Sequence, residues 1–290
     1  MKFVLVLVAA RDKITLTEAM VRRIREHVAG TEPVWLSHGE AAEISCMVEP
    51  EPDLVAAALD HAPVDALCVK SRGRRKAVLL ADMDSTIVTC ETLDELAVEA
   101  GIGDRIAEIT RRSMAGEVDF AAALRERVAL LEGLDIAALE RAWRRTEITP
   151  GARELVATMR AHGAATALVS GGFTYFTARV AAELGFDIHR ANTLLDDGSR
   201  LTGTVAEPVL DRDAKRAALH EIAEKRGAKL GATMAVGDGA NDLAMIADAG
   251  MGVAYHAKPI VTAQAKLRVD HADLRALLFA QGYPASVFRS

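Results

Sequence analysis

A run of apolar residues near the middle of this chain ends directly in two acids. Ala77–Ala81 contains no polar residue, and Asp82 and Asp84 follow it. Such an uninterrupted run predicts a strand that is covered on both faces, as in a parallel sheet. After residue 150 the sequence alternates between helical and strand patterns, with strands expected at 164–169, 233–236 and 251–254. This alternation predicts an α/β fold built on a parallel sheet.

Residues 92–146 contain no second run of this kind. They show helical periodicity instead, as in 120–131, where Leu124, Val128 and Leu131 fall on one stripe. The sequence therefore predicts that a helical insertion, at about 90–150, interrupts the sheet domain.

Residues 1–70 predict a separate small α+β unit. Strands are expected at 2–8, 33–37, 43–48 and 64–69, and helices follow Thr15 or Thr17 and cover 53–61. The order βαββαβ is typical of a split-βαβ sandwich, and it is similar to that of the small amino-acid-sensing ACT domains. The basic run at 71–76 is interpreted as a solvated linker rather than a nucleic-acid patch, which leaves 77–290 as the second domain.

Composition excludes several classes of protein. The chain has 290 residues, 50% of them hydrophobic, and a formal net charge of −6, which disfavours bulk nucleic-acid binding. Cys46, Cys68 and Cys90 form no CxxC pair, so we expect neither a disulfide framework nor a zinc site but reduced thiols in a cytoplasmic protein. No apolar stretch reaches the ~18 residues of a membrane helix, and the apolar N-terminus is interpreted as a strand rather than a signal peptide.

Four polar signals lie where the strands predicted at 77–81, 164–169 and 233–236 end, or on a neighbouring helix. Open parallel sheets bind ligands beyond the carboxyl ends of their strands. The first is Asp82-Met83-Asp84-Ser85-Thr86. A carboxylate can attack phosphorus and form an aspartyl-phosphate, and a second carboxylate can protonate the leaving group and then activate water. A solvated turn is the alternative for this motif taken alone.

The second signal is Ser170-Gly171-Gly172, which we expect to open a helix and to bind phosphate through its hydroxyl and amides. A strand–helix turn with a serine cap is the alternative.

The third signal is Lys215, whose charge can offset that of a phosphoryl group, although a single helical lysine is usually a surface residue. The fourth is the GDGxND segment 237–242, where Asp238 suits Mg²⁺ as a direct ligand and Asp242 as its support.

In this order the four motifs resemble those of the haloacid dehalogenase-like hydrolases, over residues 76–270. The resemblance implies a Rossmann-like sheet with a mobile helical cap inserted after the first strand. It also implies that Mg²⁺ is held by Asp82, Asp238 and the backbone carbonyl of Asp84. The phosphate would be bound by a set of polar groups, namely Ser170, Gly171, Lys215 and Asn241.

Further details resemble the phosphoserine phosphatases within that superfamily. Glu91 stands where that family binds the substrate ammonium, and Arg127 where it binds the carboxylate, with Arg125 as a competitor. Arginine suits a carboxylate because its planar fork donates two parallel hydrogen bonds. Met114 and Phe120 match apolar cap positions that exclude water, with plain core packing as the alternative.

The resemblance implies Mg²⁺-dependent hydrolysis of O-phospho-L-serine to L-serine and phosphate, the last step of L-serine biosynthesis. The alternatives are a related phosphatase or phosphotransferase, for example with homoserine as acceptor, and an inactive amino-acid sensor. A dehalogenase has no use for Asp84 or a metal. L-serine as an effector and a homodimer are left open, and no nucleic-acid or membrane partner is expected.

Overall fold

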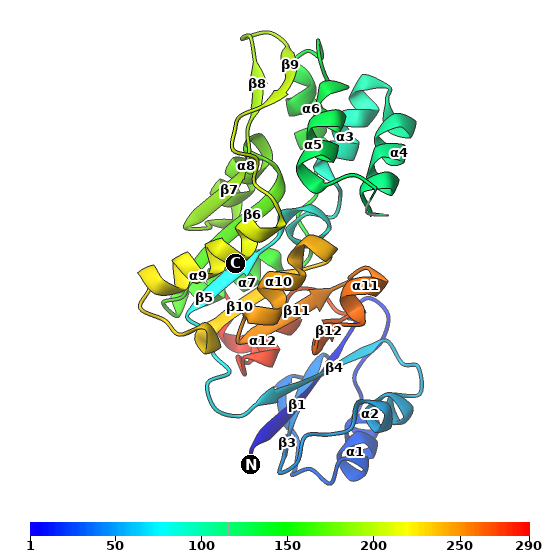
Figure 1. The fold of residues 1–290 in the computed structure, drawn as a ribbon. Coiled ribbons are helices and arrows are strands. Elements are labelled where there is room, and N and C mark those ends of the chain that lie inside the picture. Colours follow the sequence, from blue (N-terminus) through cyan, green and yellow to red (C-terminus); the bar gives the residue numbers. More distant parts are fainter. Residues whose placement is uncertain (115–116) are drawn as a thin grey trace.

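The computed structural model describes residues 1–114 and 117–290. Figure 1 shows that the molecule has three parts, which follow one another along its long direction. A helical cap lies at one end, the main sheet with its helices lies in the middle, and the N-terminal domain lies at the other end.

The central sheet has six parallel strands in the order β12-β11-β10-β5-β6-β7. Its strands are β5 (Val78–Ala81), β6 (Ala165–Phe173), β7 (Ile188–Asn192), β10 (Thr233–Gly237), β11 (Met251–Tyr255) and β12 (Leu267–Val269). All four residues of β5 are buried, which is the physical basis of its apolar sequence. The predicted parallel α/β sheet is therefore confirmed.

Helices cover both faces of this sheet. One face packs against α9 (Arg212–Lys225), α10 (Leu243–Asp248) and α11 (Pro259–Thr262) through one apolar cluster. The other face packs against α7 (Ala152–Ala161), α8 (Thr174–Leu184) and α12 (Ala276–Ala280). The sequence missed β12 and α12, because a three-residue strand and a wholly apolar five-residue helix are too short to show a period.

The predicted helical insertion forms the cap. Its helices are α3 (Thr92–Ala100), α4 (Gly103–Met114), α5 (Phe120–Ala129) and α6 (Ala137–Arg145). A hairpin of β8 (Leu194–Asp196) and β9 (Leu201–Val205) joins them, since backbone hydrogen bonds link Gly133 and Leu134 to Leu201. In Figure 1 this hairpin extends from the sheet domain to the cap helices.

The N-terminal domain follows the βαββαβ order expected from the sequence. It comprises β1 (Phe3–Ala9), α1 (Glu18–His27), β2 (Val34–Ser37), β3 (Ala41–Cys46), α2 (Pro52–Leu59) and β4 (Val64–Lys70). The four strands form an antiparallel sheet in the order β2-β3-β1-β4. Thr17 caps α1 by accepting a hydrogen bond from the backbone N–H of Met20.

Alternation along β1 buries both faces of this sheet. Leu5 and Leu7 pack with the helices of their own domain, whereas Val4, Val6 and Val8 belong to the same apolar cluster as α12 and the main sheet. The second face is therefore covered by the main-sheet domain rather than by water.

Polar contacts reinforce this interface. Asp65, which is 5% exposed, accepts hydrogen bonds from the backbone N–H groups of Asp270, His271 and Ala272. Glu40 pairs with Arg275 at 2.8 Å. A buried carboxylate requires such donors, so Asp65 fixes the N-terminal domain to the segment after β12.

The basic run at 71–76, which the sequence predicts to be a solvated linker, is solvated in part: Arg72, Gly73 and Arg75 are exposed, whereas the other residues are half-buried or buried. Lys76 is 9% exposed and donates to the carbonyl oxygens of Gly73 and Gly231. Arg74 pairs with Glu43 at 2.7 Å, and the Arg75 guanidinium lies over the ring of Tyr283. These long side chains find partners because the two domains lie directly against each other. Among the described residues, no helix has the length and apolarity needed to cross a bilayer.

All four motifs lie beyond Lys76, so the sequence alone predicts that a chain beginning near Arg72 folds and remains active. The shared core changes this expectation. Without residues 1–71, α12 loses its cover of β1 and β4. Each large apolar side chain that is uncovered costs roughly 1.5–3 kcal/mol, out of a total of about 5–15 kcal/mol. We expect the shortened chain to aggregate or to unfold many degrees below the full chain in a circular-dichroism melt. Cooperative unfolding within a few degrees of the full chain would contradict this.

Candidate active site

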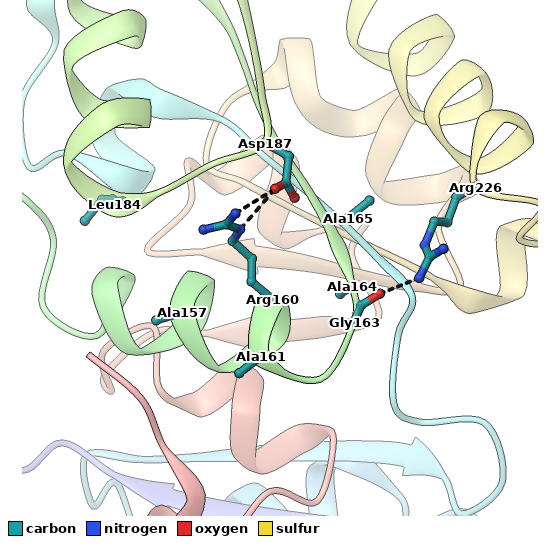
Figure 2. Close-up of a pocket in the computed structure, with 9 residues that line it drawn as sticks. All are labelled: Ala157, Arg160, Ala161, Gly163, Ala164, Ala165, Leu184, Asp187 and Arg226. Carbon is teal, nitrogen blue, oxygen red and sulfur yellow. Dashed lines mark hydrogen bonds and ion pairs between the residues drawn. The ribbon is translucent and has the colours of Figure 1, made fainter.

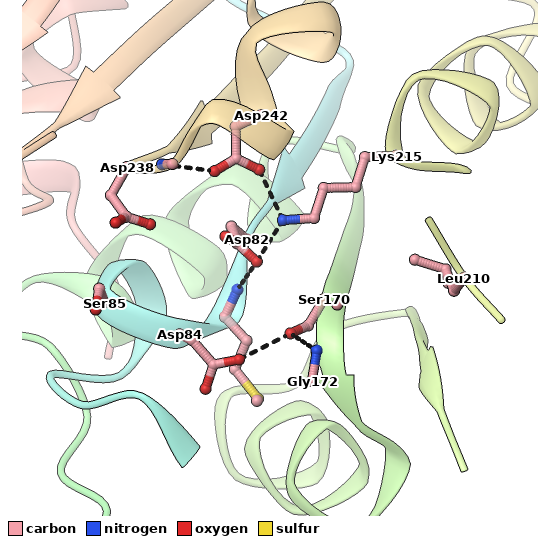
Figure 3. Close-up of polar contacts among 12 residues, drawn as sticks. Asp82, Asp84, Ser85, Ser170, Gly172, Leu210, Lys215, Asp238 and Asp242 are labelled. Carbon is pink, nitrogen blue, oxygen red and sulfur yellow. Dashed lines mark hydrogen bonds and ion pairs between the residues drawn. The ribbon is translucent and has the colours of Figure 1, made fainter. Parts of the chain in front are cut away.

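The four predicted motifs meet at the carboxyl ends of β5, β6 and β10. Asp82 follows β5, Ser170 lies near the end of β6, and Asp238 follows β10. Figure 3 shows their side chains facing one another, together with Lys215 from α9. Parallel strands bring these ends to one edge of the sheet, so residues more than 150 positions apart form one cluster.

A buried lysine lies between two of the aspartates. Lys215 is 1% exposed, and its Nζ lies 2.6 Å from Oδ1 of Asp82 and 2.7 Å from Oδ1 of Asp242. Burial and the Asp242 carboxylate raise the pKa of Asp82 well above its ordinary value, and Lys215 opposes that shift. Although burial lowers the pKa of Lys215, Asp242 and Asp82 raise it above its ordinary value, so the ammonium stays charged.

The second acid of the first motif has a different environment. Asp84 accepts hydrogen bonds from the backbone N–H of Thr92 at 2.9 Å and from Oγ of Ser170 at 3.1 Å. Burial and the nearby Glu91 carboxylate raise the pKa of Asp84 to about 6. Asp82 and Asp84 are thus held by different partners, which suits two different chemical roles.

The Ser170-Gly171-Gly172 segment differs from its prediction. It does not open a helix: β6 continues to Phe173 and α8 begins at Thr174. The pairing of β6 with β7 shifts register between Val169 and Phe173, which bends the chain here. Ser170 Oγ accepts the backbone N–H of Gly172 at 2.9 Å and donates to Asp84, so the serine hydroxyl links this segment to Asp84.

Two glycines are required by close approach. A Cβ at Gly172 would lie 2.7 Å from Oδ2 of Asp84, and one at Gly237 would lie 2.3 Å from Cγ of Asp242. Any side chain there would displace a carboxylate of the cluster. The local sequence thus leaves room for acids that approach the backbone closely.

Three buried carboxylates could hold a metal ion. Oxygen atoms of Asp82, Asp238 and Asp242 lie within 4.8 Å of one another. Oδ2 of Asp242 accepts the backbone N–H of Gly239 and its Oδ1 is bound by Lys215, so Asp242 acts as a support. Asp82 and Asp238 remain as ligands, and a set of hard carboxylate oxygens fits Mg²⁺.

The cap contributes the residues expected to recognise the rest of a substrate. Arg127 is half-buried: burial lowers the pKa of its guanidinium, and the negative charges of Asp94 and Glu91 oppose that shift. Arg125 is exposed and pairs instead with Glu207 at 2.8 Å. The structure therefore favours Arg127 over its competitor.

The Phe120 ring lies against the Ser170-Gly171-Gly172 segment, since a Cβ added at Gly171 would be 3.0 Å from Cζ of Phe120. Asn241 is half-buried beside Gly239, in the segment that also carries Asp242. Met114 ends α4, and its side chain lies outside the described part of the structure. The prediction for Met114 therefore stays a prediction.

Sequence reasoning missed three residues near the site. Lys258 lies 3.3 Å from Asp238 and 3.7 Å from Glu91. Asn192 is buried and donates to the carbonyl oxygen of Gly171, which fixes that loop. Asp94 has a pKa that burial and Glu91 raise. Nothing in their local sequence signals these roles, although the position of Asp94 one turn after Glu91 on a helix could have indicated that they share a face.

A hollow of about 600 Å³ lies away from the aspartate cluster. It is drawn in Figure 2 and adjoins Ala164 and Ala165, at the start of β6 and so at the opposite edge of the sheet from the aspartates. Arg160 in this hollow is paired with Asp187, and Arg226 donates to the carbonyl oxygen of Gly163. Its polar groups already have partners, so the aspartate cluster is the candidate site.

Comparison with known proteins assigns the class. A haloacid dehalogenase-like hydrolase model matches residues 79–247, and the chain belongs to that family. A crystal structure of a HAD family hydrolase from Salmonella enterica serovar Typhi matches 96% of this chain and 98% of its own, with 25% identity and a TM-score of 0.85. That match includes the N-terminal domain.

Several similar proteins of this family are named phosphoserine phosphatases. One from Archaeoglobus fulgidus is 43% identical over 73% of this chain, and the match spans 62% of that protein, less than two thirds of its length. A structure of a phospho-aspartyl intermediate analogue of phosphoserine phosphatase is 40% identical. It covers 71% of this chain and 98% of its own, with a TM-score of 0.66.

The environment of Asp84 predicts a pH dependence of stability. Without metal, the folded chain keeps a proton on Asp84 up to about pH 6, whereas the unfolded chain releases it near pH 4. This contribution to the free energy of unfolding is full below about pH 4 and is lost as pH rises through 6.

Asp84→Asn removes the titration. In urea unfolding with chelator, we expect wild type to lose stability relative to Asp84→Asn between about pH 4 and 6. Glu91→Gln should narrow this window, because Glu91 helps to raise the pKa of Asp84. A wild-type to Asp84→Asn difference that stays constant over this range contradicts the assignment.

Proposed function

We propose that this chain is a Mg²⁺-dependent phosphoserine phosphatase, which hydrolyses O-phospho-L-serine to L-serine and phosphate. The observation that carries the proposal is the juxtaposition of Asp82, Asp84 and Lys215 beneath a cap that presents Glu91 and Arg127. The first three residues suit phosphoryl transfer, and the last two suit the charged groups of an amino acid. The similarity to phosphoserine phosphatases supports the same reaction.

In the first step, a carboxylate oxygen of Asp82 attacks phosphorus. A bond forms between Asp82 and phosphorus as the bond to the serine oxygen breaks. Asp84 gives its proton to that oxygen, so L-serine leaves as the neutral alcohol. The raised pKa of Asp84, about 6, keeps a proton available at this position.

In the second step, water attacks phosphorus and Asp84 takes its proton. The bond to Asp82 breaks, phosphate leaves, and both carboxyl groups return to their starting state. The Lys215 ammonium, 2.6 Å from Asp82, stabilises the nucleophile as an anion and offsets charge on the phosphoryl oxygens. Ser170, the Gly171 amide and Asn241 supply further donors to those oxygens.

Asp82, Asp238 and the Asp84 backbone carbonyl would hold Mg²⁺, which supplies positive charge opposite the phosphoryl oxygens when bound. The cap then selects the substrate. Glu91 accepts the ammonium and Arg127 donates to the carboxylate, while Phe120 excludes water above Gly171.

Phosphate release from a panel of phosphomonoesters, with Mg²⁺ and with chelator, tests this function. We expect phosphoserine to be preferred, phosphate to appear without any added acceptor alcohol, and chelator to stop turnover. Asp82→Asn should lose nearly all activity, because an amide cannot form the aspartyl-phosphate. Activity of Asp82→Asn within about tenfold of wild type would contradict the role of Asp82.

The cap residues predict substrate choice. A hydrogen bond to a charged group contributes roughly 1.5–3 kcal/mol, so losing one should cost about tenfold to a hundredfold in kcat/KM. Arg127→Ala and Glu91→Gln should impair phosphoserine far more than p-nitrophenyl phosphate, which has neither carboxylate nor ammonium. The measurement is the ratio of kcat/KM for the two substrates.

Arg125→Ala is the matched control, because this exposed arginine on the same helix pairs with Glu207. If Arg125→Ala shifts the ratio and Arg127→Ala does not, the wrong arginine has been assigned. If neither shifts it, the amino-acid substrate is wrong.

A further inference from the structure

Lys258 is a cation at the candidate active site that none of the four motifs supplies. Its Nζ lies 3.3 Å from Oδ2 of Asp238 and 3.7 Å from Oε1 of Glu91. Asp238 follows β10 in the core, whereas Glu91 directly precedes α3 of the cap. One ammonium therefore contacts both the group proposed for the metal and the group proposed for the substrate ammonium.

The backbone fixes the position of Lys258. Its N–H donates to the carbonyl oxygen of Asp238 at 3.0 Å. The preceding His256 donates its N–H to Val269, and its ring Nε2 lies 2.9 Å from the carbonyl oxygen of Ala272. The N–H of Ala272 is in turn held by Asp65 of the N-terminal domain. The side chain itself is 45% exposed, so its ammonium is free to turn toward water.

The surrounding carboxylates need positive charge. Burial is the largest cause that raises the pKa of Asp84, Asp94 and Asp238, and the negative charge of Glu91 raises all three further. Burial raises the pKa of Asp238 most, and Lys258 is the group that opposes that rise. A cation beside Asp238 and Glu91 therefore stabilises the site in the absence of a ligand.

We propose that Lys258 is an internal counter-ion that stands in for the two cations of the loaded site, Mg²⁺ at Asp238 and the substrate ammonium at Glu91. Both ligands then compete with Lys258 for its carboxylates. Lys258 thus lowers the affinity for each cation and stabilises the empty enzyme. The part concerning the ammonium rests on the proposed function, and the part concerning Mg²⁺ does not depend on the substrate.

The counter-ion role of Lys258 predicts in which direction its removal changes stability and Mg²⁺ affinity. Removing the charge leaves the carboxylates of the empty site uncompensated, so the metal-free protein is destabilised. The same change strengthens Mg²⁺ binding, because the ion no longer replaces another cation. A ligand that binds more tightly stabilises the folded chain more, so saturating Mg²⁺ should restore much of the lost stability.

The experiment compares Lys258→Met with wild type, with Lys258→Arg, which keeps the charge, and with Lys266→Met. Lys266 is an exposed lysine on the segment between α11 and β12 and serves as the matched control. Mg²⁺ affinity is measured by calorimetric titration of the chelator-treated protein, and melting temperature is measured with chelator and with saturating Mg²⁺.

We expect Lys258→Met to bind Mg²⁺ about tenfold more tightly at low salt, from the Coulomb energy of neighbouring charges. Its melting temperature should fall with chelator and recover with Mg²⁺, whereas Lys258→Arg and Lys266→Met should behave as wild type. Unchanged or weaker Mg²⁺ binding overturns the proposal, as does an equal loss of melting temperature with and without Mg²⁺.

The ammonium part is tested by the kcat/KM ratio of phosphoserine to p-nitrophenyl phosphate. Lys258→Met should raise this ratio severalfold, and a constant or lower ratio overturns competition at Glu91. If wild type shows no preference for phosphoserine, the proposed function fails, while the Mg²⁺ measurements still decide the role of Lys258.

Discussion

The buried ion cluster of Lys215 with Asp82 and Asp242 is the constraint around which the site is built. Its three side chains are almost wholly buried, and each comes from a different part of the chain. Carboxylates lose their hydration on burial and repel one another, so they lie together only if a cation is fixed between them. The ends of β5 and β10 bring the aspartates together, and α9 supplies the ammonium. The apolar strands position the aspartates, the glycines leave space for their carboxylates, and Lys215 compensates their negative charge.

The N-terminal domain supports the edge of the site from the other end of the molecule. One face of its sheet continues the core around α12, and Asp65 holds the segment after β12. That segment contacts His256, two residues before Lys258. A connection therefore runs through hydrogen bonds from the N-terminal sheet to the edge of the site. The N-terminal domain therefore helps to fix the backbone near Lys258.

Prediction from sequence succeeded where the chemistry is local and failed where it depends on tertiary contacts. The apolar run before Asp82 predicted a buried strand, and helical periodicity predicted the insertion at about 90–150. The places of Ser170 and Asp238 at strand ends predicted that the two segments meet. Lys258 and Asn192 act through partners far away in the chain, and their own neighbours form no recognisable pattern. The burial of Lys76 at the end of the basic run was missed for the same reason, since it depends on Gly231, 155 residues further along.

The two ends of the proposed substrate are bound by residues that are anchored to different parts of the fold. Glu91 accepts a hydrogen bond from Ser85 at 2.9 Å and lies beside Lys258, so the ammonium site is attached to the core. The hydrogen bond that the structure gives Arg127 lies within its own helix, to the carbonyl oxygen of Ala123. Arg127 therefore moves with α5 if the cap moves. In that case the carboxylate, rather than the ammonium or the phosphate, is the substrate group whose binding depends on the position of α5.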